Sequence, residues 1–367
     1  MESKQKIHLG SSEIIWALLS VIIVKIVIAY TQNTTGVAGT ASWIMMIFIT
    51  IIALLVFYGF IALMKNFERM DIIDISKKHL GKGIAQFYGV LVCIYFIIRG
   101  SMLIRQVGDR IKFVSFKETP ISFVMIFFLL AAVIATYAGI NVIINSSKII
   151  VPIIVLMLIV IIVINIKTDG FVYLYPILGN GVKSIFVDSI PFVYLFSSMI
   201  FFLFLTPYVK NTASLKKTGT KLILIGGVFF TATTALLLTL FPYSSSKNLL
   251  MPIYLIGGIV SVGEKLQKLE AIFLVFWTLA FMLVLSLVMV FTVNILKKTF
   301  GFPDHKPFIL PVACIIFFLA ILPFRFVEVN HLEELLERYS APVVFGLPYI
   351  ILISANISRK IKKKKVA

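Results

Sequence analysis

Long apolar runs dominate the chain, and short polar breaks separate them. A helix that crosses the hydrocarbon core of a bilayer needs roughly 20 mostly apolar residues, and ten runs approach that length. The predicted spans are residues 12–31, 41–64, 84–104, 120–139, 148–167, 186–207, 222–242, 269–296, 308–324 and 341–357. The pattern therefore predicts an all-α, polytopic membrane protein with a single transmembrane domain over residues 1–367.

Composition supports this prediction. Apolar residues make up 60% of the 367 residues and charged residues only 14%, whereas soluble globular chains have about 45–50% and about 25%. This balance excludes a cytosolic enzyme, a secreted disulfide scaffold and a disordered tail. Cys93 and Cys314 both lie inside apolar runs, so we expect them to pack as small apolar side chains without a disulfide.

The net charge of +18 comes from Lys and Arg residues in the breaks between runs, where they act as topology signals. An even number of spans puts both termini on one side. With the termini in the cytoplasm, 21 basic residues lie inside and 11 outside, which agrees with the positive-inside rule. The predicted outer loop 105–119 opposes this placement, because it carries four basic residues.

Two longer connections fall on the predicted outer side. Residues 243–268 contain a short apolar stretch broken by proline and glycine, which predicts a re-entrant or surface helix pair. Residues 325–340 place leucines at helical spacing opposite acidic residues, which predicts a short amphipathic helix on the outer face. The residues of this pattern are Leu332, Leu335 and Leu336 on one side and Glu333, Glu334 and Glu337 on the other.

Several short motifs, taken in order, resemble one known family. Leu80-Gly81-Lys82 precedes the third span, Thr119-Pro120 precedes the fourth, and a Pro-x-Leu-Gly-x-Gly stretch at 176–181 follows the fifth. Residues 251–289 resemble the signature around the eighth helix, with Gly263, Lys268, Leu269, Glu270, Ala271 and Trp277 at its marked positions. Together these motifs resemble the B subunits of spore germination receptors, the GerAB-type endospore germination permeases.

This resemblance implies both a fold and a function. The family is similar to transporters of the amino acid–polyamine–organocation superfamily, which implies a LeuT-like fold of ten helices in two inverted five-helix repeats. Here the repeats would cover about 12–167 and 186–357, with the first and sixth helices broken around a ligand. The resemblance also implies A-type and lipoprotein C-type partner subunits, a small nutrient such as an amino acid as ligand, and location in the inner membrane of a bacterial spore.

The chain departs from the family pattern where a ligand would lie. In the sixth span the family carries a Pro-Phe-Gly-Glu-like run, whereas this chain has Leu195-Phe196-Ser197-Ser198. The first span lacks the usual glycine and contains Lys25. A pocket that loses a glutamate and gains a lysine is expected to prefer an anionic ligand group over an amine.

Lys25 is the most informative candidate residue, because a charge near the bilayer centre costs at least about 2.5–3.5 kcal/mol. The sequence shows no acidic residue in the middle of any predicted span. Lys25 is therefore expected either to face a polar, ligand-binding cavity or to extend its long side chain to the outer surface.

Tyr194, Ser197 and Ser198 are the other candidate ligand-binding residues, and this assignment follows from the resemblance. Their alternative role is ordinary helix packing, since serines in membrane helices often bond the carbonyl one turn back. Arg99, in the third span, is expected to extend to the outer interface.

Other chemistry has little support in the sequence. The four histidines fall in four separate breaks and form no metal-ligand spacing with the cysteines, so we expect no metal site and no cofactor. No nucleophile–base or paired-carboxylate arrangement points to an enzyme. The basic tail 359–365 predicts contact with anionic lipid headgroups or, alternatively, with an acidic partner.

Three functions remain open at this stage. The chain could be the nutrient-sensing membrane subunit of a germinant receptor, a secondary amino acid transporter, or a scaffold subunit without a ligand. The expected lack of a mid-span carboxylate favours a receptor over a proton-coupled transporter.

Overall fold

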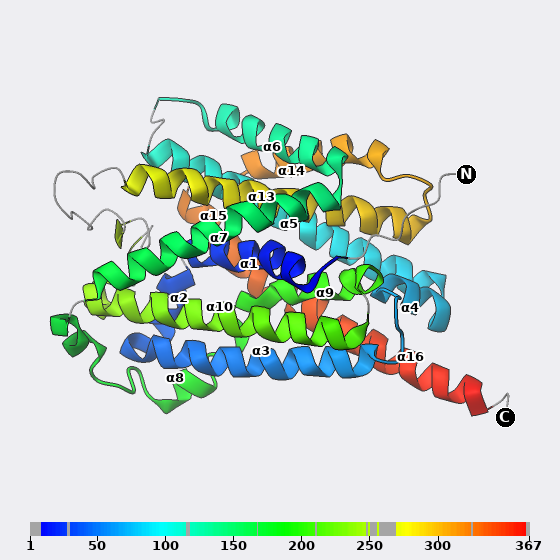
Figure 1. The fold of residues 1–367 in the computed structure, drawn as a ribbon, viewed down its shortest axis with the longest axis horizontal. Coiled ribbons are helices and arrows are strands. Elements are labelled where there is room, and N and C mark those ends of the chain that lie inside the picture. Colours follow the sequence, from blue (N-terminus) through cyan, green and yellow to red (C-terminus); the bar gives the residue numbers. More distant parts are fainter. Residues whose placement is uncertain are drawn as a thin grey trace.

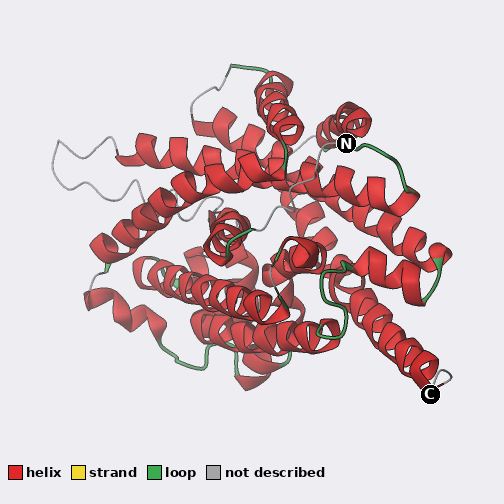
Figure 2. Ribbon diagram, turned by 45° about the vertical axis from the view of Figure 1, so that its right-hand side comes forward, coloured by secondary structure: helices red, strands yellow, loops and turns green. Residues whose placement is uncertain are grey.

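The computed structural model describes residues 9–27, 30–114, 118–166, 168–209, 211–246, 249, 255–256, 269–323 and 326–364. Throughout these ranges the regular elements are helices, and no strand occurs (Figure 2). The predicted segment 243–268 lies mostly outside the described residues; within it, Tyr243–Ser246 forms the short helix α11.

The first half of the chain contains the helices of the predicted spans one to five and the short segments between them. These are α1 (Ser11–Val27), α2 (Tyr30–Ala38), η1 (Gly39–Ala41), α3 (Ser42–Met64), α4 (Ile72–His79), α5 (Lys82–Val114), α6 (Ile121–Ala138), α7 (Ile140–Asn165) and η2 (Thr168–Leu174).

The second half starts with a short helix and an irregular sixth span and ends on a long helix. Its elements are α8 (Val182–Phe186), η3 (Ile190–Met199), α9 (Ile200–Leu205), η4 (Thr206–Tyr208), α10 (Thr212–Leu240), α11, α13 (Leu269–Phe300), η5 (Lys306–Phe308), α14 (Ile309–Ile321), α15 (Phe326–Ala341), η6 (Pro342–Gly346) and α16 (Leu347–Lys364).

The long helices run in roughly the same direction, and α1 lies among them (Figure 1). Helix α1 packs against α7, α10 and α13, and on its remaining side against η3. Its apolar side chains are consequently almost all buried, from Ile14 to Ile26. By contrast, α6, α7 and α14 carry many exposed apolar side chains on their outer faces, as expected for helices that face lipid.

Eight helices in the described residues are long and apolar enough to cross a membrane. They correspond to eight of the ten predicted spans. The other two predicted spans, the first and the ninth, form the shorter apolar helices α1 and α14, of 17 and 13 residues. The protein is thus an all-α integral membrane protein, and residues 28 and 29 of its predicted first span lie outside the described residues.

The segments that the charge count assigns to the cytoplasm meet at one end of the molecule, here called the basic end. Glu13 pairs with Lys148, Lys298 pairs with Asp71 and Asp74, and Arg359 donates to the Asn66 carbonyl at 2.7 Å. Helix α16 ends on this side (Figure 1), and α1 begins there, next to Tyr208, whose carbonyl accepts from Leu9 N at 2.9 Å. The predicted grouping of loops therefore agrees with the fold.

The loop that opposed this topology was assigned wrongly. Helix α5 continues to Val114, so Arg105 and Arg110 are helical residues and both are buried. Arg105 Nε pairs with Asp109 Oδ2 at 3.1 Å, and Arg110 Nη1 donates to the Gln106 carbonyl at 3.2 Å. Because these two arginines are helical and buried inside the protein, they no longer count as outer-loop charges.

The tenth span also differs from the prediction. Residues 325–340 do form a helix, but α15 is not a separate surface helix: it continues through the π-helical segment η6 into α16, and one apolar helix runs from His331 to Lys362. Glu333 and Glu337 consequently point into the protein rather than towards water, and both are buried. This correction changes the chemistry of the site.

Candidate functional site

The site lies where the sixth span departs from regular helix and packs against α1. The sixth span is a 3₁₀ segment, η3, with non-helical backbone angles at Phe196 (φ −97°, ψ 23°), followed by the α-helical turns of α9. Such an interruption leaves carbonyl groups outside the regular hydrogen-bond ladder, where they can accept from other groups.

Three oxygen atoms surround the Lys25 ammonium, and the three together are called the oxygen cage. Lys25 Nζ donates to the Tyr194 carbonyl at 2.8 Å and to Ser197 Oγ at 2.8 Å, and it lies 2.8 Å from Glu337 Oε1. The side chain is only 4% exposed. The prediction that Lys25 reaches the outer surface is therefore wrong, and so is the expectation that it has no acidic partner.

Helix α15 brings the acidic partners to the cage. Glu333 and Glu337 are four residues apart, so both lie on the same face of α15. That face packs against α5 and η3. An ammonium buried in this setting requires a nearby opposite charge, and Glu337 provides it from the far end of the chain.

Arg99 extends the cluster along α5. Its guanidinium pairs with Glu333 through Nη1, and its Nε lies 3.6 Å from Glu337 Oε1. Gln106 donates to the second oxygen of Glu333. Arg99 is buried, so the expectation that it extends to the interface is also wrong.

The charges at the break balance. Lys25 and Arg99 carry two positive charges, and Glu333 and Glu337 carry two negative charges within ion-pair distance. Neither carboxylate oxygen of Glu337 has a hydrogen-bond partner among the described residues, although Oε1 lies within ion-pair distance of both cations. The preference for an anionic ligand group stays a prediction, and Glu337 of α15 places a carboxylate beside Lys25 that the sequence analysis did not expect.

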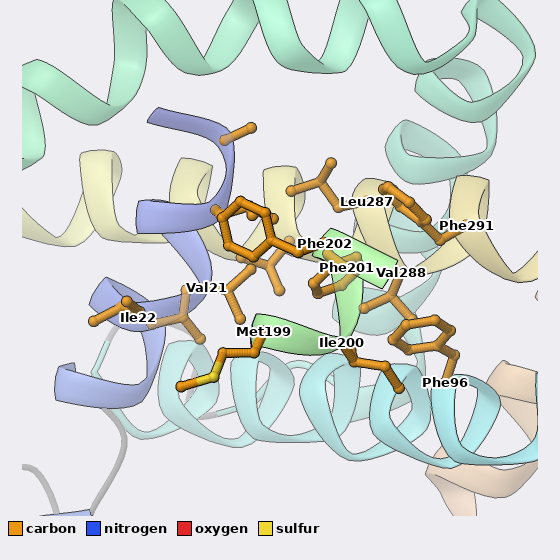
Figure 3. Close-up of a cluster of buried hydrophobic side chains, with 14 of the residues drawn as sticks. Val21, Ile22, Phe96, Met199, Ile200, Phe201, Phe202, Leu287, Val288 and Phe291 are labelled. Atoms are coloured by element: carbon orange, nitrogen blue, oxygen red, sulfur yellow. The ribbon is translucent and has the colours of Figure 1, made fainter. Parts of the chain in front are cut away.

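A cluster of buried apolar side chains gathers around Met199 and α9, just after Ser197 in the chain (Figure 3). Phe201 of α9 stacks on Phe96 of α5 at 5.1 Å between ring centroids and meets Phe291 of α13 edge-on at 4.8 Å. Buried side chains of α1 and α13 complete this cluster, called here the apolar plug; with the three rings, its members include Val21, Ile22, Met199, Ile200, Phe202, Leu287 and Val288. Close packing of this kind leaves few voids as large as a water molecule.

The structure brings three of the four predicted ligand-binding residues together. Lys25 contacts the carbonyl of Tyr194, lies 5.7 Å from the centre of its ring, and contacts the hydroxyl of Ser197. Ser198 is buried one position further on, but no hydrogen bond joins it to Lys25 in the described part of the chain. Within the same ranges, no group of three His, Cys, Asp or Glu side chains is placed to hold a metal ion.

Sequence reasoning missed Glu333, Glu337 and Arg99 as members of the site. One signal was available: two glutamates at an i, i+4 spacing lie directly before a span, and Lys25 and Arg99 are two buried cations that require partners. The sequence pattern indicated a surface helix because its leucines and glutamates separate into two faces, and only the fold reveals that the acidic face is the covered one.

An interrupted sixth span beside a buried polar cluster resembles the broken helices of membrane transporters. A sequence profile of the spore germination protein family matches residues 9–328. The chain therefore belongs to the spore germination protein family, as its motifs predicted.

Three curated relatives from Bacillus subtilis (strain 168) support this assignment. The chain is 23% identical to spore germination protein A2 over 336 residues, covering 90% of each chain. It is 20% identical to spore germination protein KB over 327 residues, covering 86% of this chain and 85% of that one. It is also 20% identical to spore germination protein B2 over 253 residues, covering 69% of each.

Among solved structures, the chain is similar to MhsT, whose crystal structure was determined in complex with L-phenylalanine. The TM-score is 0.70 at 15% identity, covering 95% of this chain and 89% of the MhsT chain. At this identity the likeness shows the fold alone, which is the LeuT-like fold predicted from the motifs.

Proposed function

We propose that this protein is the membrane subunit of a spore nutrient germinant receptor and that it senses a small zwitterionic nutrient such as an amino acid. The single observation that carries the proposal is the oxygen cage, where a buried lysine joins the broken sixth span to α15 through Glu337. Membership of the spore germination protein family supports the receptor role. Sensing requires no catalysis, so the proposal assigns no enzymatic activity.

The ligand has one place to bind at this cage. The three ammonium protons of Lys25 already have three oxygen acceptors, and two of these acceptors belong to η3 itself. A nutrient carboxylate therefore replaces Glu337, and the nutrient amine pairs with the released glutamate. A zwitterion keeps the balance of two positive and two negative charges, whereas an anion or a cation alone would leave one buried charge unpaired.

Displacement of Glu337 provides a route for the signal. Glu337 lies on α15, which joins α16 through the π-helical segment Pro342–Gly346. Helix α16 packs against α4 and reaches the basic end, where Ser358 donates to the His79 carbonyl at 3.1 Å. A shift of α15 that changes this end of the molecule would alter the surface offered to a partner.

The proposed partners are an A-type subunit and a lipoprotein C-type subunit, in the inner membrane of a bacterial spore with both termini of this chain cytoplasmic. Lys77, Lys78 and Lys82 lie together at the basic end. Lys77 donates to the Lys298 carbonyl and is already used, whereas Lys78 and Lys82 are exposed and available. Charge reversal of those two lysines is expected to weaken binding of the A subunit's soluble part, and full retention of binding would contradict this choice.

The test of the proposed function is Lys25→Met in spores. The variant removes the ammonium but keeps an unbranched chain, so it is expected to abolish the nutrient response while leaving the protein in the membrane. The matched control is Lys148→Met, which removes a partly exposed ion pair at the basic end and is expected to respond normally. A normal response of Lys25→Met to a panel of amino acids and organic acids would contradict the proposal and favour the scaffold role.

A second candidate function is secondary amino acid transport, and one observation favours it. Glu333 and Glu337 are buried carboxylates within an apolar span, which the sequence analysis did not expect. Such carboxylates are typical of proton-coupled transporters. Uptake of labelled amino acids into proteoliposomes driven by a pH gradient would support transport; the apolar plug and the paired state of both glutamates favour the receptor.

A further inference from the structure

The ligands of the Lys25 ammonium form the kind of site that binds a free monovalent cation. A backbone carbonyl, a hydroxyl and a carboxylate oxygen, each 2.8 Å from Nζ, are all hard oxygen donors. In transporters with interrupted helices, unwound carbonyls at the break coordinate the coupling cation. The Tyr194 carbonyl has this position here, next to the non-helical Phe196.

We propose that the oxygen cage of Tyr194, Ser197 and Glu337 is a monovalent-cation site that the chain fills with its own ammonium. Lys25 enters the cage from α1 and is buried there. The tethered ammonium is always present, so the site requires no dissolved ion. The cation site stands on these contacts alone; its consequence, a nutrient response independent of sodium, rests on the proposed function.

The charges around the oxygen cage leave no room for a second cation. Arg99 also lies next to Glu337, with Nε 3.6 Å from the same oxygen, Oε1, that faces Lys25. A second cation in the cage would add a third positive charge against two glutamates, so a free ion and the Lys25 ammonium exclude each other. Removal of the ammonium should therefore create a vacancy that a small cation of the same charge fills.

The experiment is chemical rescue with the purified full-length protein in lipid nanodiscs. The thermal unfolding midpoint is measured in choline, sodium, potassium and methylammonium chloride at constant ionic strength, since choline is too large for the cage. Wild type is expected to have the same midpoint in all four salts. Lys25→Ala is expected to have a lowered midpoint in choline that rises by roughly 2 °C when sodium or methylammonium is tenfold above its Kd.

Two matched variants separate a cation site from general stabilisation. Lys25→Met fills the vacancy with an apolar side chain and is expected to show no rescue by any salt. Lys25→Ala combined with Ser197→Ala lacks one cage oxygen and is expected to need at least tenfold more methylammonium for the same rise.

Three results would overturn the proposal: a wild-type midpoint that depends on sodium, a Lys25→Ala midpoint that is equal in all four salts, or equal rescue of Lys25→Met. If Lys25→Ala cannot be isolated even with methylammonium present throughout, the result would also contradict the proposal, because it would mean that the vacated cage does not bind a cation. The readout is thermal stability rather than germination. If the proposed receptor function is wrong, the expected rescue by cations is unchanged, and if the rescue fails, the proposed receptor function is not affected.

Discussion

The ion pair between Lys25 and Glu337 should behave as a single energetic unit. Both side chains are almost fully buried, and Nζ lies 2.8 Å from Oε1. At an effective dielectric constant of about 20, two unit charges at this distance attract by about 6 kcal/mol. Desolvation costs several kcal/mol per ion, so the net contribution of the pair is small, although each charge depends on the other.

Removal of one partner alone is therefore the damaging change. Lys25→Met leaves Glu337 with only the more distant Arg99, and Glu337→Met leaves Lys25 with two neutral acceptors. Each single variant is expected to lower the free energy of unfolding by about 3–5 kcal/mol. The double variant removes both charges, keeps Arg99 paired with Glu333, and is expected to recover most of that loss.

The assay is a double-mutant cycle on the free energy of unfolding, measured by reversible denaturation in mixed micelles. The coupling energy is expected to be at least about 3 kcal/mol. The control cycle uses Lys148→Met and Glu13→Gln at the partly exposed pair, where about 0–1 kcal/mol is expected. Effects of the Lys25 and Glu337 variants that simply add, to within about 0.5 kcal/mol, would refute the buried pair.

Three further predictions concern other parts of the molecule. Burial raises the pKa of Asp71 to about 6, despite the opposing effect of Lys298, so its native carboxyl keeps a proton that the unfolded chain loses near pH 4. The free energy of unfolding should consequently fall as the pH rises from about 4 to 6, and Asp71→Asn, which can still cap α4, should remove this fall; an unchanged pH profile would contradict the burial. Gly227 of α10 meets Thr50 of α3 so closely that no Cβ fits without movement, so Gly227→Val should lower the amount of folded protein in the membrane, whereas Gly83→Ala, in open space, should not. In a background with exposed Cys314 replaced by serine, an impermeant thiol reagent should label a cysteine at Ser245 in intact cells but not one at Lys217; labelling at Lys217 would invert the topology.

The apolar runs by themselves determined that this is a helical membrane protein. Backbone groups in lipid must be satisfied within each segment, so a long apolar run has almost no alternative to a helix. The positions of Lys and Arg in the breaks correctly grouped the loops that meet at the basic end. Short motifs identified the family, and Lys25 and Ser197, which the sequence analysis placed in one candidate site, are in contact.

Only the tertiary structure decided which charges meet there. Lys25 and Glu337 lie at opposite ends of the chain, and no local pattern connects them. The i, i+4 spacing of Glu333 and Glu337 is compatible with a solvent-exposed surface helix and with a buried helix. Which of the two forms depends on whether α5 and η3 cover the acidic face. Arg105 and Arg110 show the same ambiguity, since a basic residue near a predicted span end can belong to a loop or to a longer helix. Burial of a charge is a property of the neighbours that the fold supplies, so the sequence could single out Lys25 but not the charges that surround it.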